Sequence, residues 1–357
     1  MEFLYSNLSP VRTKYSTFTD KFYSLIPMAV RLDIAVGYVT ADSLAELQQT
    51  VAYNKNIETL NLIIGMHYLD KFTKLEYNAA VGLNDFLRKE RRGEVKLVRP
   101  FRFHGKLYAF SNSVGTFAGI IGSNNLSSIV ESRTRIYEAA ALISEQGHAV
   151  KIREFIDTLS TDAADNIADC PITESDFKVH NILLEDHECV TKLTNEKHAD
   201  VLSSLTDLNF EIPLVKNGNV PEKSNLNVFF GEGRLNRAKG VVIPRHWYET
   251  EIIVPSTITT MPGYPQKDTP FAVFDVITDD GWKFSCKVSG DYSKNFRSED
   301  DLKILGKWIK GRLENYGVLE VGHLVTAETF ARYGRDNFTL KKTAAPNLWY
   351  LDFGVNK

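Results

Sequence analysis

The chain contains few cysteines and no long hydrophobic run. Three cysteines occur among 357 residues, an odd number at wide spacing (Cys170, Cys189, Cys286). This argues against a disulfide framework and against a cysteine-rich zinc site. No segment approaches the roughly 18 apolar residues that span a membrane, and the N-terminal segment lacks the apolar stretch of a signal peptide. We therefore expect a soluble protein of a reducing compartment, the cytoplasm.

The chain also lacks an excess of basic residues. Lysine and arginine number 42 against 45 aspartates and glutamates, which gives a net charge of −3. A strongly basic chain would have indicated nucleic acid, but a local basic loop can exist within a neutral total. Hydrophobic residues make up 43%, enough for a real core, so disordered and fibrous classes are excluded. At roughly 150 residues per domain, the length predicts two domains.

The first half alternates strand-like and helix-like segments, which is the α/β pattern. Apolar runs rich in strand formers predict strands at 32–38, 59–64, 94–98, 106–110, 116–121 and 136–143. Helical spacing predicts helices after a capping box at Ser43 and Glu46, over 71–92 and over 146–159. We assign residues 1–170 to this α/β domain.

The second half is mostly β in pattern. Residues 160–197 are polar and acidic without a sustained period, and we place a linker at 171–205. In a second domain over 206–357, we expect strands at 226–230, 251–254, 271–278 and 282–288, with a hairpin turn at 279–281. One helix is predicted over 300–315, capped by Ser298.

Five polar residues at strand ends form the strongest functional signal. His104 and Lys106 are two residues apart on one expected strand, so their side chains point to the same side. Ser123 and Asn125 repeat that spacing at the end of the next apolar run, and Glu138 begins a further one. If these strands pair, all five side chains converge on one patch.

These residue types suit attack on a phosphodiester. A neutral imidazole at His104 is a nucleophile that can form a covalent intermediate. Lys106 and Asn125 would donate to the phosphoryl oxygens as charge develops, and Ser123 would assist in positioning. Glu138 could fix the tautomer of His104 by accepting from its other ring nitrogen. This set requires no metal, and no metal site is predicted: His180, His187, Cys189 and His198 match no zinc spacing.

At these positions the sequence resembles the phospholipase D superfamily. Its hallmark is His-x-Lys followed by Gly-Ser-x-Asn, here His104–Lys106 and Gly122–Asn125, and its usual downstream acid corresponds to Glu138. The resemblance implies a mixed sheet flanked by helices. Many phospholipase members carry an aspartate near the position of Ser111, and nuclease members commonly lack it. Its absence favours nucleic acid over lipid.

The signature occurs once in the chain, whereas the superfamily active site contains two copies related by a two-fold axis. The resemblance therefore implies a homodimer with the active site at its interface. One His104 would be the nucleophile, and His104 of the partner subunit would protonate the leaving oxygen as general acid.

The second half contains two polar loops whose side chains could read bases or hold phosphates. It resembles the pseudobarrel DNA-binding domain of plant transcription factors, which also occurs in restriction endonucleases. The candidate DNA-binding residues of the first loop are Arg234, Asn236, Arg237 and Lys239. Those of the second loop are Lys287, Ser289, Asp291, Tyr292, Lys294, Asn295 and Arg297.

Taken in order, the two halves resemble the phospholipase-D-type restriction endonucleases, namely the NgoFVII-like group (with NgoAVII and CglI) and the related BfiI. The resemblance implies double-stranded DNA as substrate, a helicase-type ATPase partner and a protecting cytosine methyltransferase. The chain itself would need no cofactor, and ATP and Mg²⁺ would be used by the partner subunit. Two alternatives stay open: a lipid phosphodiesterase of the same superfamily, and a catalytically inactive DNA-binding regulator.

Overall fold

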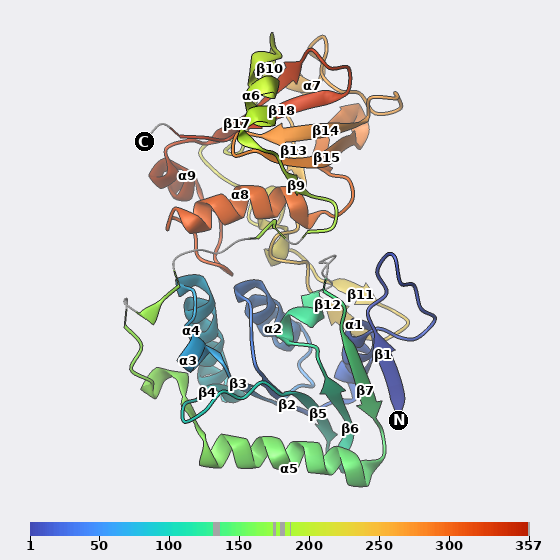
Figure 1. The fold of residues 1–357 in the computed structure, drawn as a ribbon, viewed down its shortest axis with the longest axis vertical. Helices are drawn as coiled ribbons and strands as arrows, with labels where there is room; N and C mark the ends of the chain where they lie inside the picture. The colour runs from blue at the N-terminus through green and yellow to red at the C-terminus, as the bar shows by residue number, and fades with distance from the viewer. Residues whose placement is uncertain (131–135, 174–175, 179–182, 186, 356–357) are drawn as a thin grey trace. The chain divides into compact units, whose positions relative to one another are not determined.

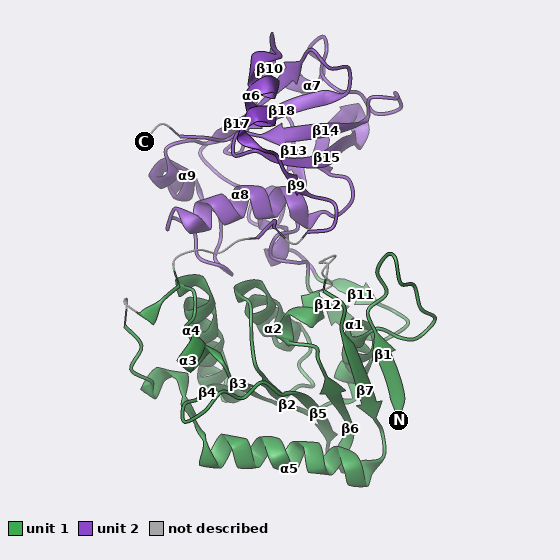
Figure 2. Ribbon diagram, in the orientation of Figure 1, with its two compact units in different colours: residues 1–132, 136–180, 233–244 green, residues 133–135, 181–232, 245–357 purple. Residues whose placement is uncertain are grey.

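A computed structural model describes residues 1–130, 136–173, 176–178, 183–185 and 187–355. These residues divide into two units (Figure 2). The first unit extends to residue 180 and includes the separate segment 233–244, and the second is built from residues 181–232 and 245–357.

The first unit is built around a mixed sheet in the strand order β1-β7-β6-β5-β2-β3-β4-β8. Strands β2, β3 and β4 are parallel, and the remaining neighbours are antiparallel. The strands are β1 (Glu2–Tyr5), β2 (Arg31–Val36), β3 (Thr59–Ile64), β4 (Gly93–Val98), β5 (Lys106–Asn112), β6 (Gly115–Gly122), β7 (Ala139–Ile143) and β8 (Ala164–Asn166). The mixed sheet flanked by helices that was expected from the sequence is confirmed.

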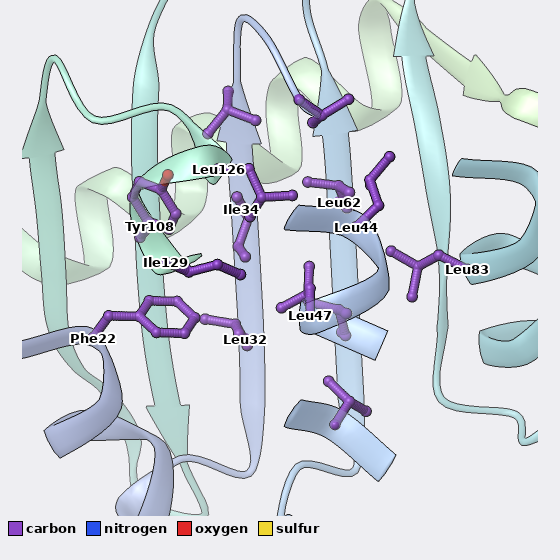
Figure 3. Packing of buried hydrophobic residues seen from close by; sticks show 14 of the residues in the cluster. Phe22, Leu32, Ile34, Leu44, Leu47, Leu62, Leu83, Tyr108, Leu126 and Ile129 are labelled. Carbon is purple, nitrogen blue, oxygen red and sulfur yellow. The ribbon is translucent and has the colours of Figure 1, made fainter. Parts of the chain in front are cut away.

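Helices cover both faces of this sheet (Figure 1). On one face lie α1 (Phe18–Leu25), α2 (Ala41–Tyr53) and α4 (Lys74–Lys89), and α3 (His67–Asp70) follows β3. Figure 3 shows Phe22, Leu44, Leu47 and Leu83 packed over the central strands. The other face is covered by α5 (Gln146–Asp162), which buries Ile152 and Ile156. Burial on both faces explains why the central strands are continuous apolar runs.

Most predicted elements of this unit are confirmed, with a correction at α2. The helix begins at Ala41, where Thr40 and Ser43 cap each other reciprocally, and not at a box formed by Ser43 and Glu46. Glu46 is buried and accepts a hydrogen bond from the Tyr23 hydroxyl at 3.1 Å. The capping box was therefore predicted about one helical turn after its actual position. The expected helix 71–92 is α4, whose N-terminus has a capping box of Thr73 and Glu76.

The second unit is built around a β-sheet with the strand order β10-β17-β18-β14-β15-β16-β13, and β9 also pairs with β15. The mainly β class expected for this unit is confirmed. The strands are β9 (Thr191–Lys192), β10 (Leu205–Pro213), β13 (Ile252–Ile253), β14 (Val273–Thr278), β15 (Trp282–Ser289), β16 (Asn295–Ser298), β17 (Asn337–Thr343) and β18 (Leu348–Asp352). The helices are α6 (Asn195–Ser203), α7 (Ser256–Thr259), α8 (Lys303–Asn315) and α9 (Ala327–Tyr333).

Two predicted elements of this unit were wrong. Residues Asn225–Phe230 form a 3₁₀ helix and not a strand, because Leu226 and Phe229 are both buried at a spacing of three. Helix α8 begins at Lys303, three residues later than predicted, and Ser298 is the last residue of β16 and not the N-cap residue. The Ser298 hydroxyl nevertheless accepts from the first-turn Leu305 amide at 3.2 Å, and the Asp301 carboxylate accepts from the Lys303 amide at 3.0 Å.

The domain boundaries differ from the predicted ones in two places. The expected linker 171–205 contains β9 and α6, and β9 pairs with β15 of the second unit. The hairpin of β11 (Arg234–Asn236) and β12 (Val241–Ile243) belongs to the first unit, although its sequence lies inside the second domain. No helix in the described ranges is long and apolar enough to cross a membrane.

Candidate active site

The five predicted catalytic residues lie at one edge of the sheet of the first unit. Lys106 is the first residue of β5, and His104 lies two residues before it. Ser123 follows the last residue of β6, and Glu138 precedes the first residue of β7. Because β5, β6 and β7 are antiparallel neighbours, these strand ends meet. Asn125 lies in the turn that follows β6.

His104 and Lys106 touch. The Lys106 Nζ lies 3.1 Å from His104 Nε2 and donates to the His104 carbonyl at 2.7 Å. The prediction that both side chains point to the same side is confirmed. An ammonium can donate to Nε2 only if that nitrogen carries a lone pair, so this contact favours the tautomer with its proton on Nδ1. In that tautomer Nε2 carries the lone pair that a nucleophile needs.

Lys106 is almost fully buried, with 6% of its surface exposed. Burial lowers the pKa of its ammonium, and the nearby Glu138 carboxylate opposes that shift. Lys106 is therefore a weakly solvated cation beside the imidazole. Such a group interacts more strongly with an incoming phosphate than a surface lysine would.

Glu138 does not hold His104 as expected. The Ser123 hydroxyl donates to the Glu138 carboxylate, and the Ala139 amide donates to Ser123 Oγ at 3.0 Å. The pairing of β6 with β7 explains this, because Gly122 lies opposite Ala140 and so brings Ser123 beside Glu138. Among the described contacts Glu138 makes no hydrogen bond to His104. Its carboxylate accepts from Ser123 and so orients that hydroxyl.

Asn125 is oriented by the backbone. Its side-chain oxygen accepts from the Tyr38 amide at 3.0 Å. This contact assigns the oxygen end of the side chain and leaves Nδ2 as the donor end. A donor is what the predicted role on a phosphoryl oxygen requires.

Gly122 shows why the signature begins with glycine. A Cβ at this position would lie 2.5 Å from the Ala139 carbonyl oxygen and 2.5 Å from the Ala140 Cα. Backbone atoms cannot give way at that distance, so only glycine permits β7 to approach. Ser111, by contrast, lies near the opposite end of β5, where its hydroxyl contacts Thr116 Oγ1 at 3.0 Å.

Two tyrosines support the site and were missed from the sequence. Tyr108 is fully buried, and its hydroxyl donates to the Asn124 carbonyl at 2.8 Å, which holds the turn that carries Asn125. It follows Lys106 by two residues, so strand alternation could have indicated it. Tyr38 lies beyond the end of β2, with its ring centroid 5.8 Å from that of His104. No spacing in the sequence links Tyr38 to this strand.

The two candidate DNA-binding loops lie on different units. The first is the β11–β12 hairpin of the first unit, where the Lys239 ammonium pairs with Asp20 at 2.6 Å and the Asn236 side chain accepts from the Lys239 amide. The Arg234 and Arg237 side chains are exposed.

The second loop belongs to the second unit, where Lys287 lies opposite Arg297 and Ser289 lies opposite Asn295 across β15 and β16. These four side chains therefore share one face of the sheet. Two like charges directly opposite each other are unfavourable, and Glu299 compensates by pairing with Lys287 at 2.9 Å. At the tip of the loop, Asp291 and Tyr292 are exposed, with Tyr292 at 76%, and Lys294 is half-buried.

Within the described residues no group of three or more histidine, cysteine, aspartate or glutamate side chains could hold a metal. Of the four residues considered as zinc ligands, His180 lies outside the described residues. His187 is buried, with Nε2 3.5 Å from the Asp301 carboxylate.

Comparisons with known proteins identify both halves. The N-terminal PLD domain of the NgoFVII restriction endonuclease matches residues 17–173, and the NgoFVII C-terminal B3-like DNA-binding domain matches residues 200–344. No curated protein matches the chain.

Several solved structures resemble 46% of the chain. Nuc from Salmonella typhimurium, a phospholipase D family member, is 15% identical with a TM-score of 0.31 and is covered over 95% of its length. NucT from Helicobacter pylori is 16% identical with a TM-score of 0.32 and is covered over 99%. The archaeal chromatin protein TrmBL2 is 11% identical with a TM-score of 0.30, and the chain spans about half of it, 53%.

The two family matches follow one another along the sequence, nuclease first and DNA reader second, and together they span most of the chain. Both matching models describe domains of the same restriction endonuclease, so the two matches support each other. The chain therefore belongs to the NgoFVII restriction endonuclease family.

Proposed function

We propose that the chain is a sequence-specific DNA endonuclease that cleaves through a covalent phosphohistidine. The contact between Lys106 and His104 carries this proposal, because it places an imidazole beside a buried lysine. The Asn125 amide supplies a second donor at the same strand ends. A nucleophile with two adjacent donors for developing phosphoryl charge is what a phosphodiesterase needs.

The first step forms a bond between His104 Nε2 and phosphorus and breaks the bond from phosphorus to O3′. Lys106 has to leave Nε2 before the attack, and a phosphate oxygen is the acceptor that replaces it. The leaving O3′ takes a proton from a general acid. Water then attacks the phosphohistidine, regenerates the imidazole and releases a 5′-phosphorylated strand.

The general acid is assigned to His104 of the partner subunit in a homodimer. The signature occurs once in the sequence, so one chain supplies one such imidazole. A two-fold dimer with the active site at its interface supplies the second. In this arrangement the two imidazoles exchange roles when the opposite strand is cut.

The second unit would choose the DNA sequence. On β15 and β16, Lys287, Ser289, Asn295 and Arg297 share a face and combine phosphate-binding with base-reading side chains. Asp291, Tyr292 and Lys294 lie on the connecting loop. The hairpin residues Arg234, Asn236, Arg237 and Lys239 would contact DNA from the nuclease unit. Double-stranded DNA is the substrate in this proposal.

Two protein partners complete the proposed system. A helicase-type ATPase subunit would use ATP and Mg²⁺ and deliver DNA, and a cytosine methyltransferase would protect the host sites. The chain itself would contribute the nuclease and reader functions in the cytoplasm, without a cofactor of its own.

The test is a cleavage assay on unmethylated DNA in EDTA, repeated with ATP, Mg²⁺ and the protein encoded beside this chain. We expect cleavage in one of these conditions, and we expect the His104→Ala variant to bind DNA normally without cutting it. Cleavage that survives in His104→Ala would remove the proposed mechanism. DNA binding without cleavage by the wild type in every condition would favour the regulator instead.

A further inference from the structure

Tyr38 contacts two members of the candidate active site at once. It lies two residues beyond β2, at the sheet edge where β5 begins and β6 ends. We propose that Tyr38 is a positioning residue that aligns the His104 ring and the Asn125 amide toward the same phosphate. This inference rests on the proposed function and adds a residue to that site.

The first contact orients the nucleophile. The Tyr38 and His104 rings meet edge to face, with centroids 5.8 Å apart and an interplanar angle of 76°. Such contacts restrict the rotation of the smaller ring. The His104 ring also contacts Lys106, whose Nζ lies 3.1 Å from Nε2. The imidazole is thus fixed by an aromatic edge and by a cation.

The second contact orients the donor. The Tyr38 amide bonds the oxygen of the Asn125 side chain at 3.0 Å, so the amide group cannot flip without losing that bond. The residue whose ring touches the nucleophile therefore also determines which end of Asn125 faces the substrate. Residue 38 thus contacts both the His104 ring, through its own ring, and the Asn125 side chain, through its backbone amide.

Tyr38 is itself held on two sides. Its hydroxyl donates to the Asp70 carboxylate at 2.7 Å, and Arg102 pairs with the same carboxylate at 2.6 Å. The next residue, Val39, donates its amide to the Nε2 of buried His67 at 3.1 Å. The segment is thus fixed by side chains from α3 and from the loop before β5, and Tyr38 has little freedom to move.

The residue before Tyr38 shows how tightly the histidine is seated. A Cβ at Gly37 would lie 3.1 Å from His104 Cδ2 and 3.2 Å from Met66 Cγ. Alanine at this position would push the imidazole by a few tenths of an ångström. Gly37→Ala therefore displaces His104 without removing any atom of Tyr38, and it provides a second variant should Tyr38→Leu fail to fold.

The test uses bis(4-nitrophenyl) phosphate, a diester whose leaving group needs no general acid. Tyr38→Leu should lower kcat by about 30-fold or more with KM changed less than about threefold, because misplaced groups slow the chemical step. Both variants keep the backbone amide that holds Asn125, but only Tyr38→Phe keeps the ring, so its kcat should stay within about threefold of the wild type. The kcat of Gly37→Ala should be lowered as that of Tyr38→Leu is.

Tyr53→Leu is the matched control. Tyr53 is also half-buried in the nuclease unit, but it is the last residue of α2, roughly 20 Å of helix from the site. Its substitution should leave kcat unchanged. The histidine ε1 signal of His104, assigned by its loss in His104→Ala, supplies a readout without turnover. It should move in Tyr38→Leu and remain in place in Tyr38→Phe.

Equal kcat values for Tyr38→Leu and Tyr53→Leu, or an unmoved His104 signal in Tyr38→Leu, would overturn the positioning role. So would a loss in Tyr38→Phe as large as that in Tyr38→Leu, because the hydroxyl would then be the important group. A different outcome would overturn the proposed function. In that outcome the wild type hydrolyses the diester no faster than His104→Ala does, while Tyr38→Leu still moves the His104 signal. The contact between Tyr38 and His104 would then be real but would have no role in catalysis.

Discussion

Lys106 combines burial with a contact to the ring beside it. The ammonium makes two described contacts, both to His104, and it is 6% exposed. Burial disfavours the charged form, so its pKa is lowered from the ordinary lysine value of 10.5. In the free enzyme this residue should lose its proton at a lower pH than a surface lysine.

This sets the pH dependence of the reaction. The active form of Lys106 is protonated, so kcat/KM should fall as the pH rises through a pKa below 10.5. A bound phosphate favours the ammonium, and the alkaline limb of kcat should therefore lie at higher pH than that of kcat/KM. Hydrolysis of bis(4-nitrophenyl) phosphate across the alkaline range checks this. An alkaline limb of kcat/KM at or above 10.5 would contradict the burial argument.

Tyr108 determines where the Asn125 turn lies. Tyr108→Phe leaves the Asn124 carbonyl without its donor, which should cost about 1–3 kcal/mol of unfolding free energy. It should also slow hydrolysis, because the turn that carries Asn125 is released. Urea unfolding and kcat measure the two effects.

Tyr23→Phe is the control for that variant. Tyr23 is equally deep in the same unit, and its hydroxyl bonds Glu46. We expect a similar loss of stability without a change in kcat. If both variants slow hydrolysis alike, the effect reports a general loss of stability and not a role of the turn.

At the scale of elements, the Asn54 side chain hydrogen-bonds the β11–β12 hairpin to α2 of the nuclease unit. Asn54 donates to the Val242 carbonyl at 3.0 Å and accepts from the Val242 amide, and neighbouring Val241 is fully buried in the nuclease core. Asn54→Ala removes both bonds, so we expect a destabilisation of about 1–3 kcal/mol. Unfolding followed by a probe in the nuclease unit measures it. An unchanged midpoint would mean that the hairpin does not depend on this anchor.

The paired strands β15 and β16 give a prediction about DNA. Arg297→Ala should weaken DNA binding and reduce the slope of log affinity against log salt by about 1, because one phosphate contact is lost. Arg332→Ala, which removes the same charge from α9, should change neither quantity. Fluorescence anisotropy at several salt concentrations distinguishes them. An unchanged slope for Arg297→Ala would remove this residue from the phosphate-binding set.

Local pattern predicted most strands of the nuclease unit, and it placed the candidate site residues at the ends of neighbouring strands, where the structure has them. Strand β3 was predicted to the residue, because apolar runs buried on both faces have sharp ends. The 3₁₀ helix at Asn225–Phe230 was misread because a short apolar run does not reveal its period. Tyr38 and the hairpin at 233–244 depend on contacts between distant segments, which local spacing cannot encode.

At the scale of the whole molecule, the chain carries a nuclease unit and a reader unit of one endonuclease family. The nuclease unit supplies one imidazole, one buried ammonium and one amide at a single sheet edge. A proposed two-fold dimer doubles this set and assigns the acid role to the second imidazole. The central claim is therefore that phosphorus from DNA becomes attached to His104.

The most direct test is to trap that attachment. Internally ³²P-labelled DNA that contains a cleavable site is mixed with the protein under cleavage conditions, quenched in alkali and digested with trypsin. Cleavage after Arg102 and Lys106 isolates the peptide Phe103–Lys106, which contains His104 and no hydroxyl side chain. We expect alkali-stable, acid-labile label on this peptide in the wild type and none in His104→Ala. Cleaved DNA with label on another peptide, or with none on the protein, would contradict it.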